Sequence, residues 1–264
     1  MHSFPFIKAE ALGNDFIILH HSSFKDDISF IRRLANRRRG VGFDQLIVYT
    51  DDHHIRFFNA DGSEAEACGN GTRCIALYLG HILQKNMLVL HCATGPLSIT
   101  IVESTYPFGK VQVTMPLPKL LERTPELEAD IRWLLDKEIF MNTFAVNVGN
   151  PHLVIFMSTL EHLDFTMVAS QLELHPFFER GANVSFVTVS GKGVLKIRVW
   201  ERGVGQTLAC GTAAYAASFA YHLLHPKACE IVVEQEGGIL LFNKEKNNWL
   251  MTGEAKIVFE GRFY

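Results

Sequence analysis

The sequence predicts an α+β fold of two pseudo-symmetric lobes, each a mostly antiparallel sheet around a central helix. Three observations lead to this prediction. The tripeptide Ala-Cys-Gly occurs twice, at 67–69 and 209–211, and a helix-like stretch follows each copy. The segments on both sides of the two copies also match one another, which indicates an internal duplication. Apolar strand pairs hinged on glycine outnumber β-α-β alternation, which favours antiparallel pairing.

The segments before the two cysteines give the first elements of each lobe. LGND (12–15) corresponds to VGNP (148–151), and GVGFDQLIV (40–48) corresponds to GANVSFVTV (181–189). In each case a glycine leads into an apolar, β-branched run that is typical of a strand. Each lobe is therefore expected to run as strands, a short helix, more strands, a Cys-Gly turn, a longer helix and a hairpin.

The segments after the cysteines give the hairpins and the boundary between the lobes. Residues 89–102 correspond to 231–243, and each segment contains two strands hinged on glycine. The proline-rich stretch TMPLPKL (114–120) is the best candidate linker. We therefore expect an N-terminal lobe over 1–116 and a C-terminal lobe over 117–254.

The last strand, 255–264, has no evident counterpart at the end of the first half. The opening strand FPFIKAEAL would leave an uncovered sheet edge in the N-terminal lobe. We therefore expect the last strand to return to the N-terminal lobe.

Composition limits the class of protein. A chain of 264 residues with 48% hydrophobic and 20% charged residues is typical of a globular protein with a substantial core. The net charge of −3 gives no field that would recruit nucleic acid or an anionic membrane. No apolar run reaches the ~18 residues of a membrane span, and the N-terminus lacks the layout of a signal peptide. We expect a cytoplasmic protein that binds neither nucleic acid nor membrane.

Two further features have plain structural interpretations. The basic cluster RRLANRRRG (32–40) is expected to be a solvated helix end capped by its glycine rather than a phosphate-binding patch. Five cysteines, an odd number, argue against a disulfide framework. Cys74, Cys92 and Cys229 are expected to be structural residues of a helix and of two apolar strands.

The two Cys-Gly turns carry the chemistry. A thiol at a helix N-terminus is stabilised as thiolate by the helix dipole, and the free N–H groups beside it can hold a carboxylate. If the two lobes face each other, Cys68 and Cys210 would meet one small molecule from opposite sides. One thiolate and one thiol in that arrangement suit inversion at the Cα of an amino acid without a cofactor.

Polar residues near the turns suit a zwitterionic substrate. Asparagines can both donate to and accept from such a molecule, whereas Glu201 could hold an ammonium and Arg202 a carboxylate. His152 could tune a neighbouring thiol. The pairs His20-His21 and His53-His54 have no cysteine or carboxylate at metal-ligand spacing, so no metal is expected. No phosphate-binding glycine motif is present either.

Seven blocks, in this order, resemble the diaminopimelate epimerase family: ALGNDF, RRLANRRRGVGFDQLIV, FNADGSEAEACGNGTRC, VNVGNPH, GANVSF, ERGVGQTLACGTAA and MTGEA. The resemblance implies two similar lobes with the active site between them, and usually a homodimer. It also implies a cofactor-independent isomerase that interconverts LL- and meso-2,6-diaminopimelate in lysine and peptidoglycan precursor biosynthesis.

The resemblance also implies roles for individual residues. Cys68 resembles the base that removes the proton from the L-configured centre, and Cys210 resembles its partner on the other face. His152 and Glu201 match positions that adjust the thiol pKa values. The matched substrate-binding positions are Asn14, Gln45, Asn59, Gly69, Asn70, Asn150, Asn183, Glu201, Arg202, Gly211 and Thr212.

Two departures from the family pattern keep other functions open. Gln206 stands where the family usually has glutamate, and Ala213 where glycine is common. Gln206 would favour a Cys210 thiolate if its side chain faced inward, and both changes leave room for a racemase of broader specificity, acting for example on shorter acidic amino acids. The remaining alternatives are a proline-racemase-like or phenazine-type isomerase, a pyridoxal-phosphate racemase, and a non-catalytic thiol-redox or ligand-binding module.

Overall fold

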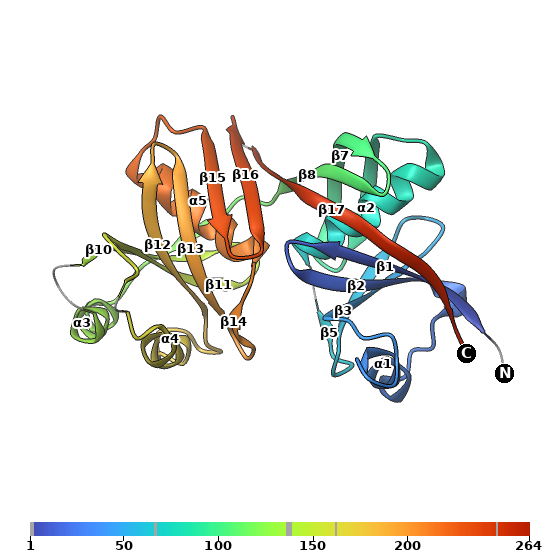
Figure 1. The fold of residues 1–264 in the computed structure, drawn as a ribbon. Helices are drawn as coiled ribbons and strands as arrows, with labels where there is room; N and C mark the ends of the chain where they lie inside the picture. The colour runs from blue at the N-terminus through green and yellow to red at the C-terminus, as the bar shows by residue number, and fades with distance from the viewer. Residues whose placement is uncertain (1–2, 66–67, 136–138, 162, 247) are drawn as a thin grey trace. The chain divides into compact units, whose positions relative to one another are not determined.

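The chain forms two compact units. Unit 1 comprises residues 1–114 and 252–264, and unit 2 comprises 115–251. These bounds lie two or three residues from the lobe boundaries expected above. The computed structural model describes residues 3–65, 68–135, 139–161, 163–246 and 248–264 (Figure 1). Within those ranges, no helix combines the length and the apolar character that crossing a membrane requires.

Unit 1 contains two sets of paired strands. β17 pairs with β1 and β1 with β2 in antiparallel fashion, β2 pairs with β3 in parallel, and β4 and β5 follow antiparallel. β6, β7 and β8 form an antiparallel meander. The elements of this unit are β1 Phe4–Ala11, β2 Asn14–His20, η1 His21–Ser23, α1 Ile28–Ala35, β3 Gln45–Tyr49, β4 Ile55–Asn59, β5 Glu64–Ala65, α2 Gly69–Leu83, β6 Met87–Cys92, β7 Gly95–Thr105, β8 Phe108–Met115 and most of β17 Asn248–Phe263.

Helix α2 is the centre of unit 1, as the sequence predicted. It contacts strands of both sets, namely β1, β2, β3, β6 and β7. The opposite face of the sheet is covered by α1, whose Phe30 and Leu34 pack with Ile17 and Leu19 of β2. Because β2 is covered on both faces, its sequence is a continuous apolar run rather than an alternating one.

Unit 2 repeats this arrangement. β9, β10 and β11 pair antiparallel, β11 pairs with β12 in parallel, and β13 and β14 follow antiparallel. β15 pairs in parallel with β13 and antiparallel with β16. The elements are β9 Lys119–Leu121, α3 Pro125–Leu134, β10 Phe140–Asn147, β11 Pro151–Met157, α4 Phe165–Glu173, β12 Asn183–Gly191, β13 Val194–Glu201, β14 Gly205–Thr207, α5 Gly211–Leu224, β15 Glu230–Gln235 and β16 Gly238–Glu245.

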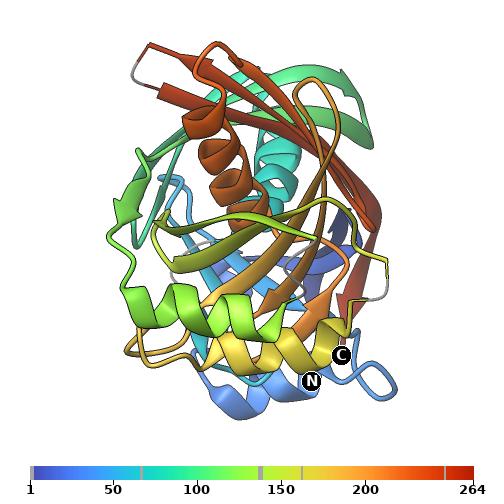
Figure 2. The ribbon, with the colours of Figure 1, turned by 90° about the vertical axis from the view of Figure 1, so that its left-hand side faces the viewer.

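Helices cover both faces of the unit 2 sheet. α3 and α4 lie side by side on one face (Figure 2), where they share an apolar core with Leu153, Ile155 and Val184. On the other face α5 contacts β10 to β13 and also β15 and β16. Five fully buried alanines of α5 let these strands approach the helix closely; they are Ala213, Ala214, Ala216, Ala217 and Ala220.

The prediction that the last strand has no counterpart was wrong. β9 follows unit 1 in the chain and pairs with β10 of unit 2, just as β17 follows unit 2 and pairs with β1 of unit 1. Each half therefore ends in a strand that joins the sheet of the other half. The counterpart escaped the sequence comparison because β9 has only three residues and lies inside the expected linker.

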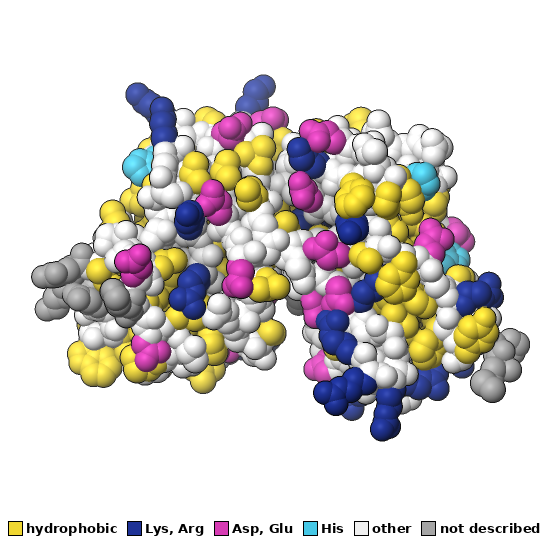
Figure 3. Space-filling model, viewed as in Figure 1, with side chains coloured by type: hydrophobic (Ala, Val, Ile, Leu, Met, Phe, Trp, Pro, Cys, Tyr) yellow, Lys and Arg dark blue, Asp and Glu magenta, His cyan; other side chains and the backbone are white. Residues whose placement is uncertain are grey.

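The basic cluster at 32–40 also differs from the prediction. α1 ends at Ala35 and is capped by Asn36, so Gly40 is not its C-cap. The Asn36 side chain accepts hydrogen bonds from the backbone N–H groups of Arg38 and Arg39, which closes the turn after the helix. Basic side chains gather on the surface of unit 1 near α1 (Figure 3), and Arg32, Arg33, Arg38 and Arg39 are exposed.

Candidate active site

Cys68 is the N-cap residue of α2. Its Sγ accepts a hydrogen bond from the backbone N–H of Gly71 at 3.3 Å, so the sulfur lies at the positive end of the helix dipole. The first turn of α2 lies directly against the sheet. A Cβ on Gly71 would be 2.9 Å from Phe57 Cε1 and 3.1 Å from Ile47 Cδ1. Glycine at this position therefore allows the first turn of α2 to pack closely against β3 and β4.

Four amide side chains lie at the same end of unit 1 as Cys68. Asn70 Nδ2 donates to Asn14 Oδ1 at 2.6 Å, and Gln45 Nε2 donates to Asn59 Oδ1 at 2.9 Å. The strand register explains the second pair, because Gln45 begins β3 directly opposite Asn59 at the end of β4. Gln45 Oε1 is buried with no hydrogen-bond partner in the structure. It is an acceptor that an ammonium group could use.

A cluster of charged side chains holds the Asn14 side chain in place. Asn14 Nδ2 donates to Asp44 Oδ2 at 3.2 Å, and Arg37 bridges Asp44 and Asp15. Lys8 donates to the Asp15 carboxylate as well. Burial raises the pKa of Asp15, but the hydrogen bonds from Arg37 and Lys8 outweigh it and lower that pKa to about 2.

Cys210 occupies the equivalent N-cap position of α5 in unit 2. It is only 7% exposed, and its Sγ lies 3.3 Å from the Thr212 hydroxyl. Its backbone N–H donates to Gln235 Oε1 at 2.8 Å. Burial raises the pKa of the Cys210 thiol well above its ordinary value, and the neighbouring Glu201 carboxylate raises it further.

His152 is fully buried between two asparagines. Its Nε2 lies 3.0 Å from Asn150 Oδ1 and 3.4 Å from Asn183 Nδ2. Burial and the charge of Arg202 lower the pKa of His152 to about 3, so the imidazole is neutral near pH 7. In the neutral ring Nε2 either donates to Asn150 Oδ1 or accepts from Asn183 Nδ2, so it orients one of the two amides and adds no charge to the site.

The remaining predicted residues of unit 2 meet at the same strand ends. The Arg202 backbone N–H donates to Asn183 Oδ1 at 3.0 Å, while its exposed guanidinium donates to the carbonyl of Arg180. Glu201 Oε1 accepts from the Thr207 hydroxyl at 2.6 Å. The structure thus gathers the predicted residues into two half-sites, one in each unit, each beside an N-cap cysteine.

The strand registers correct the alignment of the two halves. Gln45 pairs with Phe16 two residues after Asn14, and Asn183 pairs with His152 two residues after Asn150. Gln45 therefore corresponds to Asn183, three residues away from the match that the glycines suggested. By the same registers Asn59 at the end of β4 corresponds to Glu201 at the end of β13.

Comparison with known proteins identifies the family. The sequence profile described as "Diaminopimelate epimerase" matches residues 6–120 and again 144–258, once in each half of the duplication. The chain belongs to the diaminopimelate epimerase family. It is 37% identical over 276 residues to "Diaminopimelate epimerase" of Desulfitobacterium hafniense (strain DSM 10664 / DCB-2), a match that covers 97% of this chain and 96% of the relative. It is 35% identical over 277 residues to "Diaminopimelate epimerase" of Nitrosomonas eutropha (strain DSM 101675 / C91 / Nm57), covering 97% of each.

Solved structures extend the likeness of fold beyond the diaminopimelate epimerase family. A PhzF-family phenazine biosynthesis protein of Bacillus anthracis matches with a TM-score of 0.73 at 17% identity, covering 100% of both chains. A hydroxyproline epimerase of Agrobacterium vitis, with bound trans-4-OH-L-proline, matches with a TM-score of 0.67 at 12% identity and covers 98% of this chain and 92% of its own. At these identities the likeness is one of fold alone.

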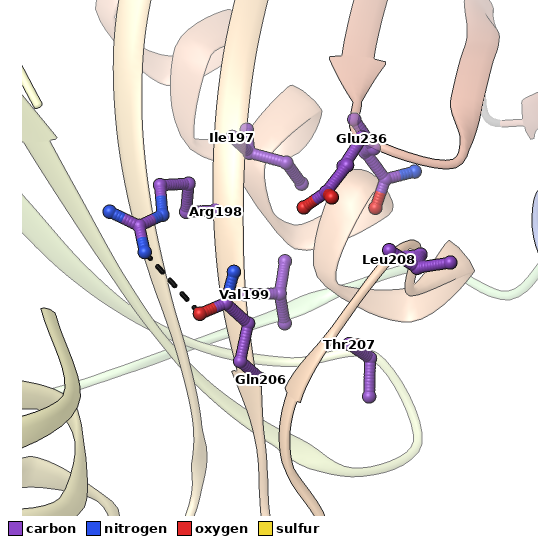
Figure 4. A pocket seen from close by; sticks show the side chains of 8 residues that line it. Ile197, Arg198, Val199, Gln206, Thr207, Leu208 and Glu236 are labelled. Atoms are coloured by element: carbon purple, nitrogen blue, oxygen red, sulfur yellow. Dashed lines mark hydrogen bonds between the residues drawn. The ribbon is translucent and has the colours of Figure 1, made fainter.

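Gln206, one of the two departures from the diaminopimelate epimerase pattern, does not face Cys210. It is exposed, and its Oε1 accepts from Arg198 Nη2 at 3.3 Å across the β13–β14 pair (Figure 4). Successive side chains of a strand point to opposite faces, and the next residue, Thr207, is the one that points to Glu201. The inward orientation considered for Gln206 was therefore wrong.

Sequence reasoning missed several groups around this epimerase-family site. Arg73, Tyr215, Gln235 and Thr207 carry no motif that singles them out; only their position relative to the two cysteines could have indicated the first two. Cys229 is exposed and is not a core residue, which contradicts its prediction, whereas Cys74 is fully buried as expected.

The histidine pairs differ from their prediction in one respect. Parallel pairing of β2 and β3 brings Asp51 beside His20 and His21, and ligand atoms of the three lie within 4.8 Å of one another. A carboxylate is therefore present beside the first pair although none lies within four residues of it in sequence, and in the second pair His54 Nδ1 lies 3.1 Å from Asp52 Oδ2. Both ring nitrogens of His20 already have hydrogen-bond partners, Ser22 and Asp51, and Asp51 is 88% exposed.

Proposed function

We propose that this chain interconverts LL- and meso-2,6-diaminopimelate by inverting one Cα, with Cys68 and Cys210 as the two bases. Membership of the diaminopimelate epimerase family supports the substrate and the isomerase class. The observation that carries the residue assignment is the repeated half-site: in each unit a cysteine caps the central helix beside amide or carboxyl groups from the same strand ends.

The reaction consists of two proton transfers. The Cys68 thiolate takes the Cα proton, the C–H bond breaks, and its electron pair delocalises into the α-carboxylate. The Cys210 thiol then gives its proton to the opposite face of Cα, which leaves Cys68 as thiol and Cys210 as thiolate. In the reverse direction the two sulfurs exchange roles.

Backbone N–H groups stabilise the charge that develops on the α-carboxylate. The N–H groups of Gly69 and Asn70 lie in the first turn of α2, and those of Gly211 and Thr212 lie in the first turn of α5. These positions have no carbonyl partner within their own helices, so they can donate to a bound carboxylate.

The substrate ammonium and the distal groups are held by side chains. Glu201 and the unpartnered Gln45 Oε1 can accept from an ammonium group. Arg202 has an exposed guanidinium that can pair with a carboxylate. The amides of Asn14, Asn59, Asn150 and Asn183 complete the hydrogen bonding, and His152 Nε2 orients one of the last two.

A broader racemase specificity has less support, because Gln206 faces away from Cys210. A homodimer and a cytoplasmic location remain predictions. Sedimentation of the purified protein would measure its oligomeric state. The protein acts on a small-molecule amino acid.

The deciding experiment is incubation with LL-diaminopimelate in D2O, with Cα deuteration followed by NMR. Wild type should exchange the Cα proton and form the meso isomer. In Cys68→Ala and in Cys210→Ala the rate of epimerisation should fall at least about a hundredfold, because each change removes one of the two acid–base groups. Cys229→Ser, a change at an exposed thiol outside the site, is the matched control and should retain the rate.

Three outcomes would change the conclusion. Full-rate epimerisation by either alanine variant would refute the two-base assignment. Equal exchange with aspartate or glutamate would establish the broader racemase instead. Binding of diaminopimelate without any Cα exchange would leave a ligand-binding module.

A further inference from the structure

Arg73 is a fully buried cation one turn into α2. Its side chain has 0% exposure. Its guanidinium donates to Asn70 Oδ1 at 2.9 Å and to the carbonyls of Gly69 and Glu254 at 3.3 Å each. All three acceptors are uncharged groups. Arg73 therefore makes three hydrogen bonds, none of which neutralises its charge.

No carboxylate forms an ion pair with Arg73 among the residues that the structure describes. Burial lowers the pKa of Arg73 to about 10, yet the group stays protonated near pH 7. An unpaired buried charge is costly, so its retention calls for an anionic neighbour. The acidic groups whose charge acts on Arg73 are Cys74, Cys68 and Glu10.

Of these three groups, Cys68 is the one suited to be the anion. Cys74 is fully buried, and burial raises the pKa of its thiol. Glu10, near the end of β1, acts on Arg73 less strongly than Cys68 does, and its carboxylate binds the backbone N–H of Gly13 at 2.7 Å. Cys68 is partly exposed and caps the helix that carries Arg73, so a thiolate there has both the helix dipole and the guanidinium in its favour. The other charges nearby, Lys8, Asp15, Arg37 and Asp44, pair with one another around Asn14.

The second half-site lacks this cation. Cys210 follows Cys68 by 142 residues, and the same offset places Tyr215 where unit 1 has Arg73. Tyr215 is also fully buried, its hydroxyl donates to the Pro116 carbonyl at 2.6 Å, and burial raises its pKa, so it is neutral. In addition, the acidic Glu201 beside Cys210 corresponds to the neutral Asn59 of unit 1.

We propose that Arg73 is a positioning residue that holds Cys68 as the thiolate of the resting enzyme, while Tyr215 and Glu201 leave Cys210 as the thiol. This inference rests on the proposed two-base reaction and assigns its starting protonation state. Two half-sites of the same build thus differ in electrostatics at two matched positions. The resting enzyme is ready to remove a proton with Cys68 and to return one from Cys210.

The test is the pH dependence of thiol alkylation, which needs no substrate. Iodoacetamide reacts with the thiolate, so the midpoint of the rate against pH reports the pKa of each cysteine, and peptide mass spectrometry separates the five. In wild type the Cys68 midpoint should lie well below that of Cys210. Arg73→Gln should raise the Cys68 midpoint by about a pH unit or more, because an opposite charge is lost. Arg73→Lys keeps the charge and should restore most of the shift.

Two results would overturn the inference. A wild-type Cys68 midpoint at or above that of Cys210 would refute it even if Arg73→Gln failed to fold. An unchanged Cys68 midpoint in an Arg73→Gln protein with native circular dichroism would reduce Arg73 to a structural role. Tyr215→Phe is the matched control, since it alters a buried hydrogen bond at the equivalent site and should leave the Cys68 midpoint in place. Loss of diaminopimelate exchange with normal midpoints would instead contradict the proposed function.

Discussion

Acid should destabilise unit 2 through His152. The unfolded chain binds a proton at this residue below its ordinary pKa of 6.5, whereas burial lowers the pKa in the folded protein to about 3. Above pH 6.5 His152 is neutral in both the folded and the unfolded chain, so it has no effect on how stability varies with pH. As the pH falls from 6.5 toward 3, only the unfolded chain binds the proton, and the free energy of unfolding falls.

The size of the effect follows from the difference between the two pKa values. At pH 4.5 the folded protein still holds His152 neutral, two pH units below the value of 6.5 in the unfolded chain. At ~1.36 kcal/mol per unit, the free energy of unfolding should drop by about 3 kcal/mol between pH 7 and pH 4.5 from this residue alone.

Urea unfolding at the two pH values measures this loss. All three tryptophans, Trp133, Trp200 and Trp249, lie in unit 2, so their fluorescence reports on that unit. His152→Gln places an amide nitrogen near the position of Nε2 and does not titrate, so it should lack this part of the pH dependence. Carboxylates titrate alike in both proteins and cancel in the comparison. His225→Gln, at an exposed histidine of the same unit, is the control and should behave like wild type. Equal pH dependence in wild type and His152→Gln would refute the reasoning.

Three further changes test the half-sites. Gly71→Ala should destabilise unit 1 by about 1–3 kcal/mol, because its Cβ would come within 2.9 Å of Phe57, whereas Gly191→Ala, with its nearest atom at 3.7 Å, should cost far less; chemical unfolding compares them. Glu201→Gln should lower the alkylation midpoint of Cys210, since it removes a charge that raises the thiol pKa, and a midpoint that stays or rises would contradict this. Asn70→Ala removes the donor to Asn14 and should raise KM more than it lowers kcat in steady-state kinetics; an unchanged KM would count against a binding role.

Local signals in the sequence were sufficient for the elements and for the two cysteines. A Cys-Gly pair before an apolar run placed both thiols at helix N-termini. The turn and the start of the helix depend only on residues that are neighbours in the sequence, so the sequence alone could show them. Glycine-hinged apolar runs placed the hairpins for the same reason. The repeat of these signals, rather than either copy alone, indicated two half-sites.

Features that depend on strand pairing could not be predicted in this way. The correspondence of Gln45 with Asn183 is set by the parallel pairs β2–β3 and β11–β12, and the glycines gave it three residues off. The sequence left open whether Gln206 faces Cys210; side chains alternate along a strand, so a shift of one residue turns a side chain to the other face. The short strand β9 became visible only through its pairing with β10.

The sequence by itself determined that this protein has two similar halves with a thiol at the start of a helix in each, and it predicted the chemistry of a two-base epimerase. Only the tertiary structure decided how the two thiols differ. A sequence does not show whether an arginine is buried or which groups surround it. At position 73 the packing of α2 against the sheet buries the guanidinium next to uncharged oxygens. The equivalent packing in unit 2 buries a phenol, and strand register brings a carboxylate to Cys210. Electrostatic asymmetry arises from burial by residues distant in sequence, which is why local pattern could not show it.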